Sequence, residues 1–258
     1  LAFEVCKQLF NLNCQVFTSS HNTYLMTNDL LRPDCNFILQ NNKIKPLQAC
    51  TDKELRFGHN MEKLFLIDAY ALIYRAYYAF IKNPRVNSKG INTSAILGFC
   101  NTLHEVITKE NPKYIAVAFD PHGPTFRSDI FPQYKAQREK TPEDILTSVP
   151  IIKDILKALK IPVITVDGYE ADDVIGTLAT KTKGMAVETY MLTPDKDYGQ
   201  LVADNVKIYR PRHGGGYEVM GVEQVNAKYG IDSPAKVIDL LALMGDSADN
   251  FPGCPGVG

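Results

Sequence analysis

This 258-residue sequence predicts an α/β fold, built on a parallel β-sheet with flanking helices. Short apolar runs alternate with longer segments of helical periodicity, and this alternation is typical of parallel βαβ units. Several of the apolar runs end at a carboxylate. Because parallel strands end at the same edge of a sheet, these carboxylates are expected to meet there.

Each expected strand is a short apolar run, and each expected helix has apolar residues on one face. Strands are expected at residues 63–68, 114–119, 162–166 and 186–192, with a hairpin at 206–219 that turns at three glycines. Helices are expected at residues 69–81, 93–110, 222–229 and 234–244.

A further helix is expected after residue 140. Thr141 is expected to cap it and Pro142 to occupy its first position, and Glu143 and Asp144 would complement its dipole. Pro150 lies inside the helical pattern and is expected to kink the helix.

The helix that follows the strand at 162–166 begins with three carboxylates, Glu170, Asp172 and Asp173. Acids in a first turn can simply complement the helix dipole. Three clustered anions repel one another, however, so they also indicate a bound cation. The point where a strand ends and a helix begins is the usual ligand crevice of an open α/β sheet.

The same arrangement recurs along the chain, which favours the metal site. The carboxylates that follow the other strands and the last helix are Asp68, Asp120, Asp195, Asp197, Asp246 and Asp249. Carboxylate oxygens select hard cations such as Mg²⁺ or Mn²⁺. Two such ions can activate a water and stabilise the leaving oxygen of a phosphodiester, so metal-dependent hydrolysis is expected.

The segment at 121–140 has little periodicity and combines cations with aromatic rings. They are Arg127, Lys135, Arg138 and Lys140, and Phe126, Phe131 and Tyr134. Cations can follow a phosphate backbone while rings stack on bases, as in single-strand binding. The alternative is a solvated surface loop. A long loop directly after Asp120 is more often functional, so we favour a role in substrate binding.

Composition argues against several classes of function. The formal net charge of −1 creates no overall field for a polyanion, so any nucleic-acid binding must rest on local basic residues. No apolar run approaches the length of a membrane span, and no membrane partner is expected. The sequence contains neither a phosphate-binding Gly-x-x-x-x-Gly-Lys-Ser/Thr loop nor a Gly-x-Ser-x-Gly elbow, and His104 falls within an expected helix.

Residues 1–60 differ from the rest of the chain. They have poor periodicity and contain four of the six cysteines, whose spacing fits no zinc motif. The cysteines are expected to be reduced thiols. Met61 immediately precedes the first expected strand, so we expect the natural protein to begin there and residues 1–60 to be upstream sequence or an accessory tail.

A series of short motifs runs in order from Met61 to Gly258. They are Leu66-Ile67-Asp68, Tyr74-Arg75-Ala76, Ala118-Phe119-Asp120, Thr125-Phe126-Arg127, Tyr134-Lys135-Ala136-Gln137-Arg138, Gly168-Tyr169-Glu170-Ala171-Asp172-Asp173, Thr193-Pro194-Asp195-Lys196-Asp197 and Gly245-Asp246-Ser247-Ala248-Asp249. This part of the chain resembles the N-terminal 5′ nuclease domain of bacterial DNA polymerase I, in the flap endonuclease family. The resemblance implies a PIN-like, resolvase-like fold that removes nucleotides or flaps from the 5′ ends of DNA, and RNA primers, in replication and repair.

The resemblance also implies roles for single residues. The first of two ions would be held by Asp68, Asp120, Glu170 and Asp172, and the second by Asp195, Asp197, Asp246 and Asp249, with Asp173 between them or acting through water. Asp68, Asp120 and Asp195 would thereby be catalytic, together with Lys135 and Arg138 at the scissile phosphate. DNA would also be contacted by Tyr74, which stacks on the terminal base, and by Arg75, Arg127 and Tyr134.

The last residues resemble the hairpin of a helix-hairpin-helix element, which in the family grips duplex DNA with a potassium ion. Gly253, Gly256 and Gly258 would supply backbone contacts. The chain is expected to be a fragment with three parts, at 1–60, 61–232 and 233–258. A monomer in the bacterial cytoplasm is expected.

Alternatives from other classes fit less well. A haloacid-dehalogenase-like phosphatase needs a second Asp where Tyr70 stands, and a calcium loop starting at Asp195 needs a Glu where Val206 stands. A catalytically weak or inactive DNA-binding relative of the same family stays open. Nine clustered acids would hinder DNA binding alone and argue against it.

Overall fold

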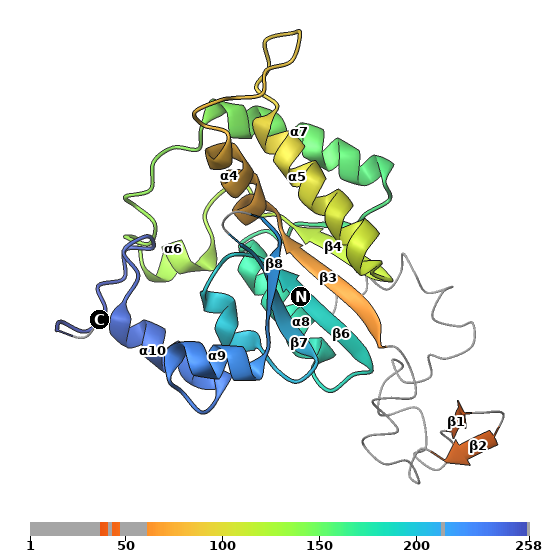
Figure 1. The fold of residues 1–258 in the computed structure, drawn as a ribbon. Coiled ribbons are helices and arrows are strands. Elements are labelled where there is room, and N and C mark those ends of the chain that lie inside the picture. The colour runs from red at the N-terminus through yellow and green to blue at the C-terminus, as the bar shows by residue number, and fades with distance from the viewer. Residues whose placement is uncertain (1–36, 41–42, 47–60, 213–214, 257–258) are drawn as a thin grey trace.

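The computed structural model describes residues 37–40, 43–46, 61–212 and 215–256. Its main body is a six-stranded sheet with helices on both faces (Figure 1). Helices α4, α5 and α7 cover one face, and α8, α9 and α10 lie toward the other. The predicted α/β fold is confirmed.

The sheet is parallel except at one edge. Its strands are β3 (Glu62–Asp68), β4 (Tyr114–Ala118), β5 (Val163–Ile164), β6 (Val187–Leu192), β7 (Val206–Pro211) and β8 (Tyr217–Met220). Their spatial order is β5-β4-β3-β6-β7-β8, and only the β7–β8 hairpin is antiparallel. The strand expected at 162–166 is reduced to two residues, because Val166 instead forms an isolated bridge with Tyr169 across a tight turn.

The helices follow the predicted order. They are α4 (Ala69–Ala79), α5 (Ser94–Glu105), α6 (Phe126–Ile130), α7 (Glu143–Ala158), α8 (Ala171–Thr182), α9 (Val222–Tyr229) and α10 (Val237–Met244). The chain continues from α5 into a π-helical turn, Val106–Glu110, and short 3₁₀ turns cover Asp197–Leu201 (η4) and Pro234–Lys236 (η5).

Two expectations about the helices were wrong. The 121–140 segment contains the short helix α6, which its sequence periodicity does not reveal. Thr141 does not cap α7, because Pro142 takes the cap position. The Thr141 hydroxyl instead accepts a hydrogen bond from the Tyr74 hydroxyl at 3.1 Å. Pro150 lies inside α7, as expected.

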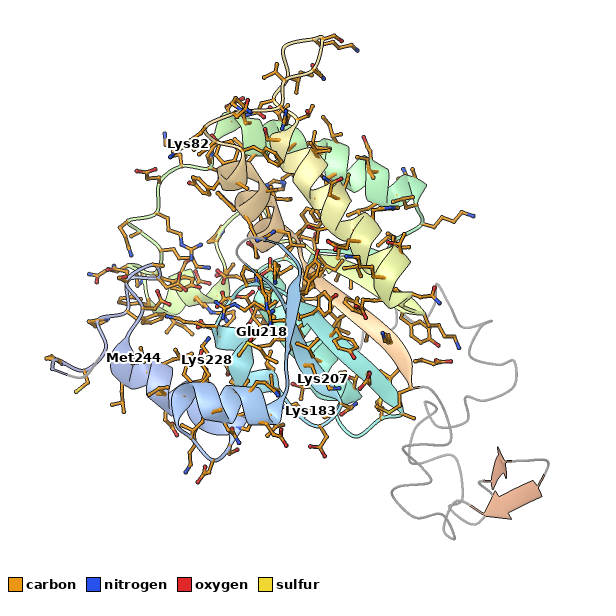
Figure 2. All side chains as sticks on the ribbon, viewed as in Figure 1. Lys82, Lys183, Lys207, Glu218, Lys228 and Met244 are labelled. Carbon is orange, nitrogen blue, oxygen red and sulfur yellow. The ribbon has the colours of Figure 1, made fainter. Side chains whose placement is uncertain are left out.

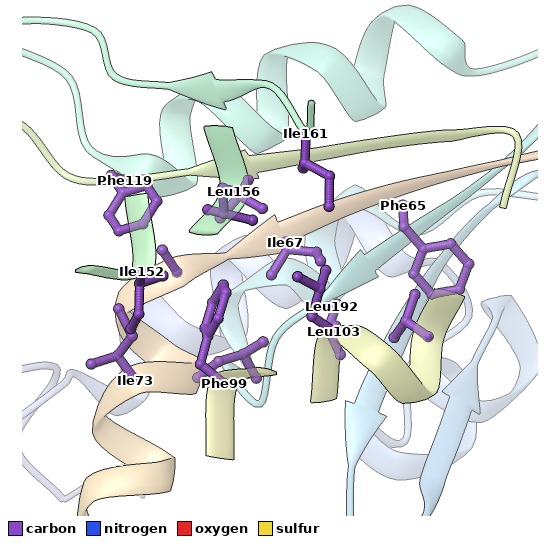
Figure 3. Close-up of a cluster of buried hydrophobic side chains, with 14 of the residues drawn as sticks. Phe65, Ile67, Ile73, Phe99, Leu103, Phe119, Ile152, Leu156, Ile161 and Leu192 are labelled. Atoms are coloured by element: carbon purple, nitrogen blue, oxygen red, sulfur yellow. The ribbon is translucent and has the colours of Figure 1, made fainter. Parts of the chain in front are cut away.

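Two apolar cores hold the sheet between its helices. Along β3, Phe65 and Ile67 face α4, α5 and α7 (Figure 3). Leu66 faces α8 on the other side of the sheet. Phe65, Leu66 and Ile67 are each at most 1% exposed. Burial on both faces is typical of a parallel strand, and it fixes the strand ends where the acids lie.

Outside the main sheet, β1 (Phe37–Gln40) and β2 (Lys43–Pro46) form an antiparallel pair. Four cysteines lie outside the described residues, and Cys100 and Cys254 are free thiols. Within the described part of the chain, no helix is long and apolar enough to cross a membrane.

Candidate active site at the carboxyl edge of the sheet

Four acids, which we call the inner acids, lie where β3, β4 and α8 meet: Asp68, Asp120, Glu170 and Asp172. Asp68 ends β3 and caps α4, because its carboxylate accepts a hydrogen bond from the Ala71 amide at 3.1 Å. Asp120 follows β4 and accepts one from the Ala171 amide at 2.8 Å. Backbone groups therefore fix these two carboxylates at the predicted edge of the sheet.

The first turn of α8 uses its three acids differently. Glu170 is the cap residue, and the Asp173 carboxylate accepts a hydrogen bond from its backbone amide at 2.9 Å. Asp172 instead accepts a hydrogen bond from the Tyr198 hydroxyl at 2.6 Å. Helix capping thus accounts for Asp173, whereas Glu170 and Asp172 face other parts of the site.

Burial and mutual repulsion raise the pKa values of three inner acids, Asp68, Asp120 and Asp172. Burial is the main cause of the rise in the pKa of Asp68 to about 7, with contributions from Asp172 and Asp120. Burial likewise raises the pKa of Asp172 to about 6, and repulsion from Asp195 and Asp120 adds to it. The pKa of Asp120 is raised for the same reasons, with Glu170 as the repelling neighbour. Such a cluster favours any cation that neutralises it.

The outer acids are Asp195, Asp197, Asp246 and Asp249. Asp195 and Asp197 follow β6 and are joined locally, since the Asp197 amide donates to the Asp195 carboxylate at 2.9 Å. Asp246 and Asp249 belong to a turn after α10 that closes through a bridge between Asp246 and Phe251. The outer acids therefore come from two segments that are distant in sequence.

Asp197 is crowded by another acid and has a buried carboxylate oxygen without a hydrogen-bond partner. Burial, followed by repulsion from Asp195, raises its pKa to about 6. Its Oδ1 atom is buried and has no hydrogen-bond partner. For Asp246, burial acts to raise the pKa, but the hydrogen bonds from Lys196 and the Ala248 amide and the charge of Lys196 together outweigh it, and the pKa is lowered.

Four cations near the acids are each paired with one of them. The ion pairs are Arg127 with Asp173 at 2.7 Å, Lys135 with Glu170 at 2.9 Å, Lys196 with Asp246 at 2.9 Å, and Arg138 with Asp249. The 121–140 segment thus lies against the acids, as predicted from its place after Asp120. Arg127 contacts both oxygens of Asp173, so this pair is held in a fixed geometry.

Residues 131–138 dock onto the turn at 246–251. The side-chain amide of Asn250 donates to the Gln133 carbonyl at 2.9 Å, and Phe131 stacks on Phe251 with ring centres 5.7 Å apart. Tyr134 lies between the two groups of acids and donates to Glu170 at 3.0 Å. This docking places Asp249 near the inner acid Glu170, since the Tyr134 hydroxyl contacts both.

The sequence analysis missed three residues of the site. Lys196 lies between two acids in sequence, and this spacing could have indicated an ion pair. Tyr198 and Phe251 gave no local signal, because their contacts join segments that are distant in sequence.

The other predicted DNA contacts lie at the periphery. Tyr74 is half-buried in a row of rings with Tyr70 and Tyr78, and Arg75 donates to the Arg212 carbonyl at 3.0 Å. Gly253 packs on Gly245 so closely that a Cβ on Gly253 would lie 2.6 Å from the Gly245 nitrogen.

Gly256 lies in open space, and Gly258 lies outside the described residues. The close packing of Gly253 on Gly245 is enough by itself to explain why a glycine stands at position 253.

The donor set fits a hard divalent cation. Within residues 61–212 and 215–256, no three acids, histidines or cysteines already converge as a complete ligand set. Three of the expected ligands, Glu170, Asp249 and Asp246, are paired with the chain's own cations. Oxygen donors, raised pKa values and the unpartnered Asp197 Oδ1 all suit Mg²⁺ or Mn²⁺.

The site thus combines acids at the ends of parallel strands with a basic segment beside them, and comparison with known proteins shows the family of the chain. Residues 63–230 match the protein family described as the 5′-3′ exonuclease N-terminal resolvase-like domain, and the chain belongs to this family. The family predicted from the motifs is confirmed.

Among particular relatives, the chain is 40% identical over 195 residues to DNA polymerase I of Treponema pallidum, covering 76% of this chain and 20% of that protein. It is 44% identical over 200 residues to a 5′-3′ exonuclease of Aquifex aeolicus, covering 77% and 66%. The chain thus spans about a fifth of the length of the DNA polymerase I relatives that it matches.

Solved structures share the fold. A bacteriophage T5 flap endonuclease in a complex with DNA and metal ions matches with a TM-score of 0.61 and 20% identity, covering 76% of this chain and 71% of that one. The T5 5′-exonuclease with bound zinc matches with a TM-score of 0.59 and 22% identity, covering 76% and 72%.

Proposed function

We propose that this chain is a metal-dependent 5′-3′ exonuclease and flap endonuclease that hydrolyses phosphodiester bonds at the 5′ ends of DNA. Its substrates would be nicks, 5′ flaps and RNA primer–DNA junctions, in replication and repair. The observation that carries the proposal is the meeting of inner and outer acids beneath a basic, aromatic segment. The relatives named above, which include a 5′-3′ exonuclease, support it.

Two ions, Mg²⁺ or Mn²⁺, would occupy the site. The inner acids would hold the first ion, and Asp195, Asp197, Asp246 and Asp249 the second. Bound divalent ions lower the pKa of a coordinated water and offset charge on a phosphodiester. Asp173 would act from outside the ligand set, because Arg127 and the start of α8 already use its oxygens.

The basic segment would contact the substrate. Lys135 and Arg138 reach the acids from above the strand ends, so their charges can offset charge that develops on a phosphate held there. The Tyr74 ring would stack on the terminal base. A potassium ion at the turn after α10 and a grip on duplex DNA by Gly253 and Gly256 complete the proposed contacts.

The protein would act on DNA as a monomer in the bacterial cytoplasm, either as part of a DNA polymerase I or as a stand-alone exonuclease. The two kinds of relative suggest these two settings.

Cleavage of a 5′-flap DNA in the presence and absence of Mg²⁺ tests the function directly. The chain should release the flap only with metal, and Asp195→Asn should abolish release, because a neutral amide binds Mg²⁺ weakly. Circular dichroism of the variant serves as the control for folding. A folded Asp195→Asn variant that cuts at the wild-type rate would contradict the assignment of the outer acids.

The role of the basic segment has a separate test. Lys135→Ala or Arg138→Ala should slow single-turnover cleavage at saturating DNA more than it weakens DNA binding, since the charge is proposed to act on the transition state. Unchanged single-turnover rates would reduce this segment to a surface feature.

A further inference from the structure

Lys135 and Arg138 differ from the other cations of the site in coming from one short segment. Lys135 pairs with the inner acid Glu170, and Arg138 pairs with the outer acid Asp249. Residues 131–138 therefore connect the two groups of acids with their own positive charges.

We propose that Lys135 and Arg138 are internal counter-ions of the acids, that a divalent cation displaces them, and that this displacement releases residues 131–138 from the turn at 246–251. The inference rests on the metal-dependent function proposed above. It adds a closed, self-neutralised state in which the cations that would contact phosphate are held by the chain's own carboxylates.

Burial makes a counter-ion necessary at Glu170. This residue is 7% exposed, and a buried carboxylate without a partner is costly. The Lys135 ammonium lies 2.9 Å from its Oε2 and supplies the missing charge.

A divalent cation carries twice the charge and binds several carboxylates at once, so it competes well for the same oxygens. The ion would then repel the ammonium, and Lys135 would be free for a phosphate.

The backbone at Lys135 indicates that the closed state is held under strain. Its φ of 55° lies in the left-handed region, which residues other than Gly, Asn and Asp rarely adopt. The closed contacts hold it there, including a 3.3 Å hydrogen bond from the Lys135 amide to the Asp249 carbonyl. Such strain persists only while surrounding contacts over-determine it, so loss of the ion pairs favours opening.

The other contacts of the segment are shallow enough to open. Phe251, on which Phe131 stacks, is 47% exposed, and most side chains of residues 131–138 are exposed or half-buried. Of this segment only Tyr134 is buried, and its hydroxyl bonds Glu170.

Calorimetric titration of the full chain with Mn²⁺ tests the displacement. Lys135→Met and Arg138→Met keep the length of the side chain and remove its charge. Both should bind Mn²⁺ more tightly, by about threefold to tenfold, since no internal cation has to leave first. A merely structural role for these residues would leave metal affinity unchanged or weaken it.

Lys181→Met is the matched control. Lys181 lies on α8 and shares a groove with Asp172 and Asp173, and it forms no ion pair among the described residues. Its loss removes the same charge from the same neighbourhood without freeing a carboxylate, so Mn²⁺ affinity should match that of the wild type.

The outcomes separate this inference from the proposed function. No Mn²⁺ binding by the wild-type chain would overturn the proposed function and the inference with it. Binding that is equal or weaker in both variants, with cooperative thermal unfolding intact, would overturn the inference alone. If Lys135→Met fails to fold, Arg138→Met decides, because the Arg138 side chain is 52% exposed.

A fluorescent reporter follows the release itself. The chain contains no tryptophan, so Phe131→Trp places a single tryptophan at the stacking contact with Phe251. Saturating Mg²⁺ should shift its emission to longer wavelength as the segment opens into water. Emission that stays the same at saturating Mg²⁺ would overturn the release.

Discussion

The inner and outer acids are held in place by different means. Asp68 is 6% exposed, and backbone amides at the starts of α4 and α8 orient the carboxylates of Asp68 and Asp120. Asp246 and Asp249 lie on a turn that is held by contacts with residues 131–138. The inner acids therefore belong to the sheet, as do Asp195 and Asp197 after β6, whereas the position of Asp246 and Asp249 depends on the docking of two distant segments.

This difference shows where the site can change shape. The inner acids cannot move without disturbing β3, β4 and α8, which form the two cores. Asp246 and Asp249 can move with the turn at 246–251 at little cost to the cores. We therefore expect the inner acids to set the position of the chemistry, and Asp246 and Asp249 to respond to metal and substrate.

The largest expected effect separates the two groups by activity. Asp120→Asn should lower metal-dependent cleavage of flap DNA by about 100- to 1,000-fold, because it removes an oriented charge that no neighbour can replace. Asp246→Asn should lower cleavage by about tenfold, since the turn can adjust. Equal losses in single-turnover assays would break the distinction between the inner acids and the two acids of the turn.

A close backbone contact tests the turn of the outer acids. A Cβ on Gly253 would lie 2.6 Å from the Gly245 nitrogen, so Gly253→Ala should lower the free energy of unfolding by about 1–3 kcal/mol. Gly256→Ala is the control, since Gly256 has a similar φ of 82° with nothing within 4 Å. Urea denaturation of both variants measures the difference. Identical losses would show that backbone strain alone, without the overlap, accounts for the effect.

The metal-free protein should become less stable as pH rises from about 4 to about 7. The folded-state pKa values of Asp68, about 7, and Asp172, about 6, lie above their ordinary value. Between the two limits the folded state binds more protons than the unfolded state, so the free energy of unfolding falls as pH rises. Thermal melts in EDTA across this range measure the fall.

Two variants give opposite results in that experiment. Asp68→Asn should raise the melting temperature at pH 7 and flatten its pH dependence. Asp246→Asn should lower it slightly, because Lys196 lowers the pKa of Asp246 and stabilises its charged form. A melting temperature that Asp68→Asn leaves unchanged would contradict the crowding of charge at the inner acids.

The smallest expected effect concerns the docking itself. Phe251→Ala removes the ring that contacts Phe131 and Tyr134, and should lower the free energy of unfolding by roughly 1 kcal/mol. Hydrogen exchange should quicken at residues 246–251 and stay the same at β3 and β4. Faster exchange throughout the sheet would show that the turn is part of the core.

Local patterns were enough to predict the inner acids. Each apolar run that ends at an acid is a strand end, and the parallel order places Asp68 and Asp120 at one edge. The pairing of Arg127 with Asp173 could not be predicted in this way, because 46 positions separate the two residues. Helix α6 was missed for a related reason: five residues are too few to show a helical period.

By itself, the sequence determined the α/β fold, the order of its strands and helices, and the collection of acids at the carboxyl edge. These features follow from periodicity and from the single direction in which parallel strands end. Only the tertiary structure decided which cation pairs with which acid, and that residues 131–138 dock onto the turn at 246–251. The physical reason is that ion pairs and ring stacking depend on distances of a few ångströms between distant segments, and packing of the whole chain sets those distances.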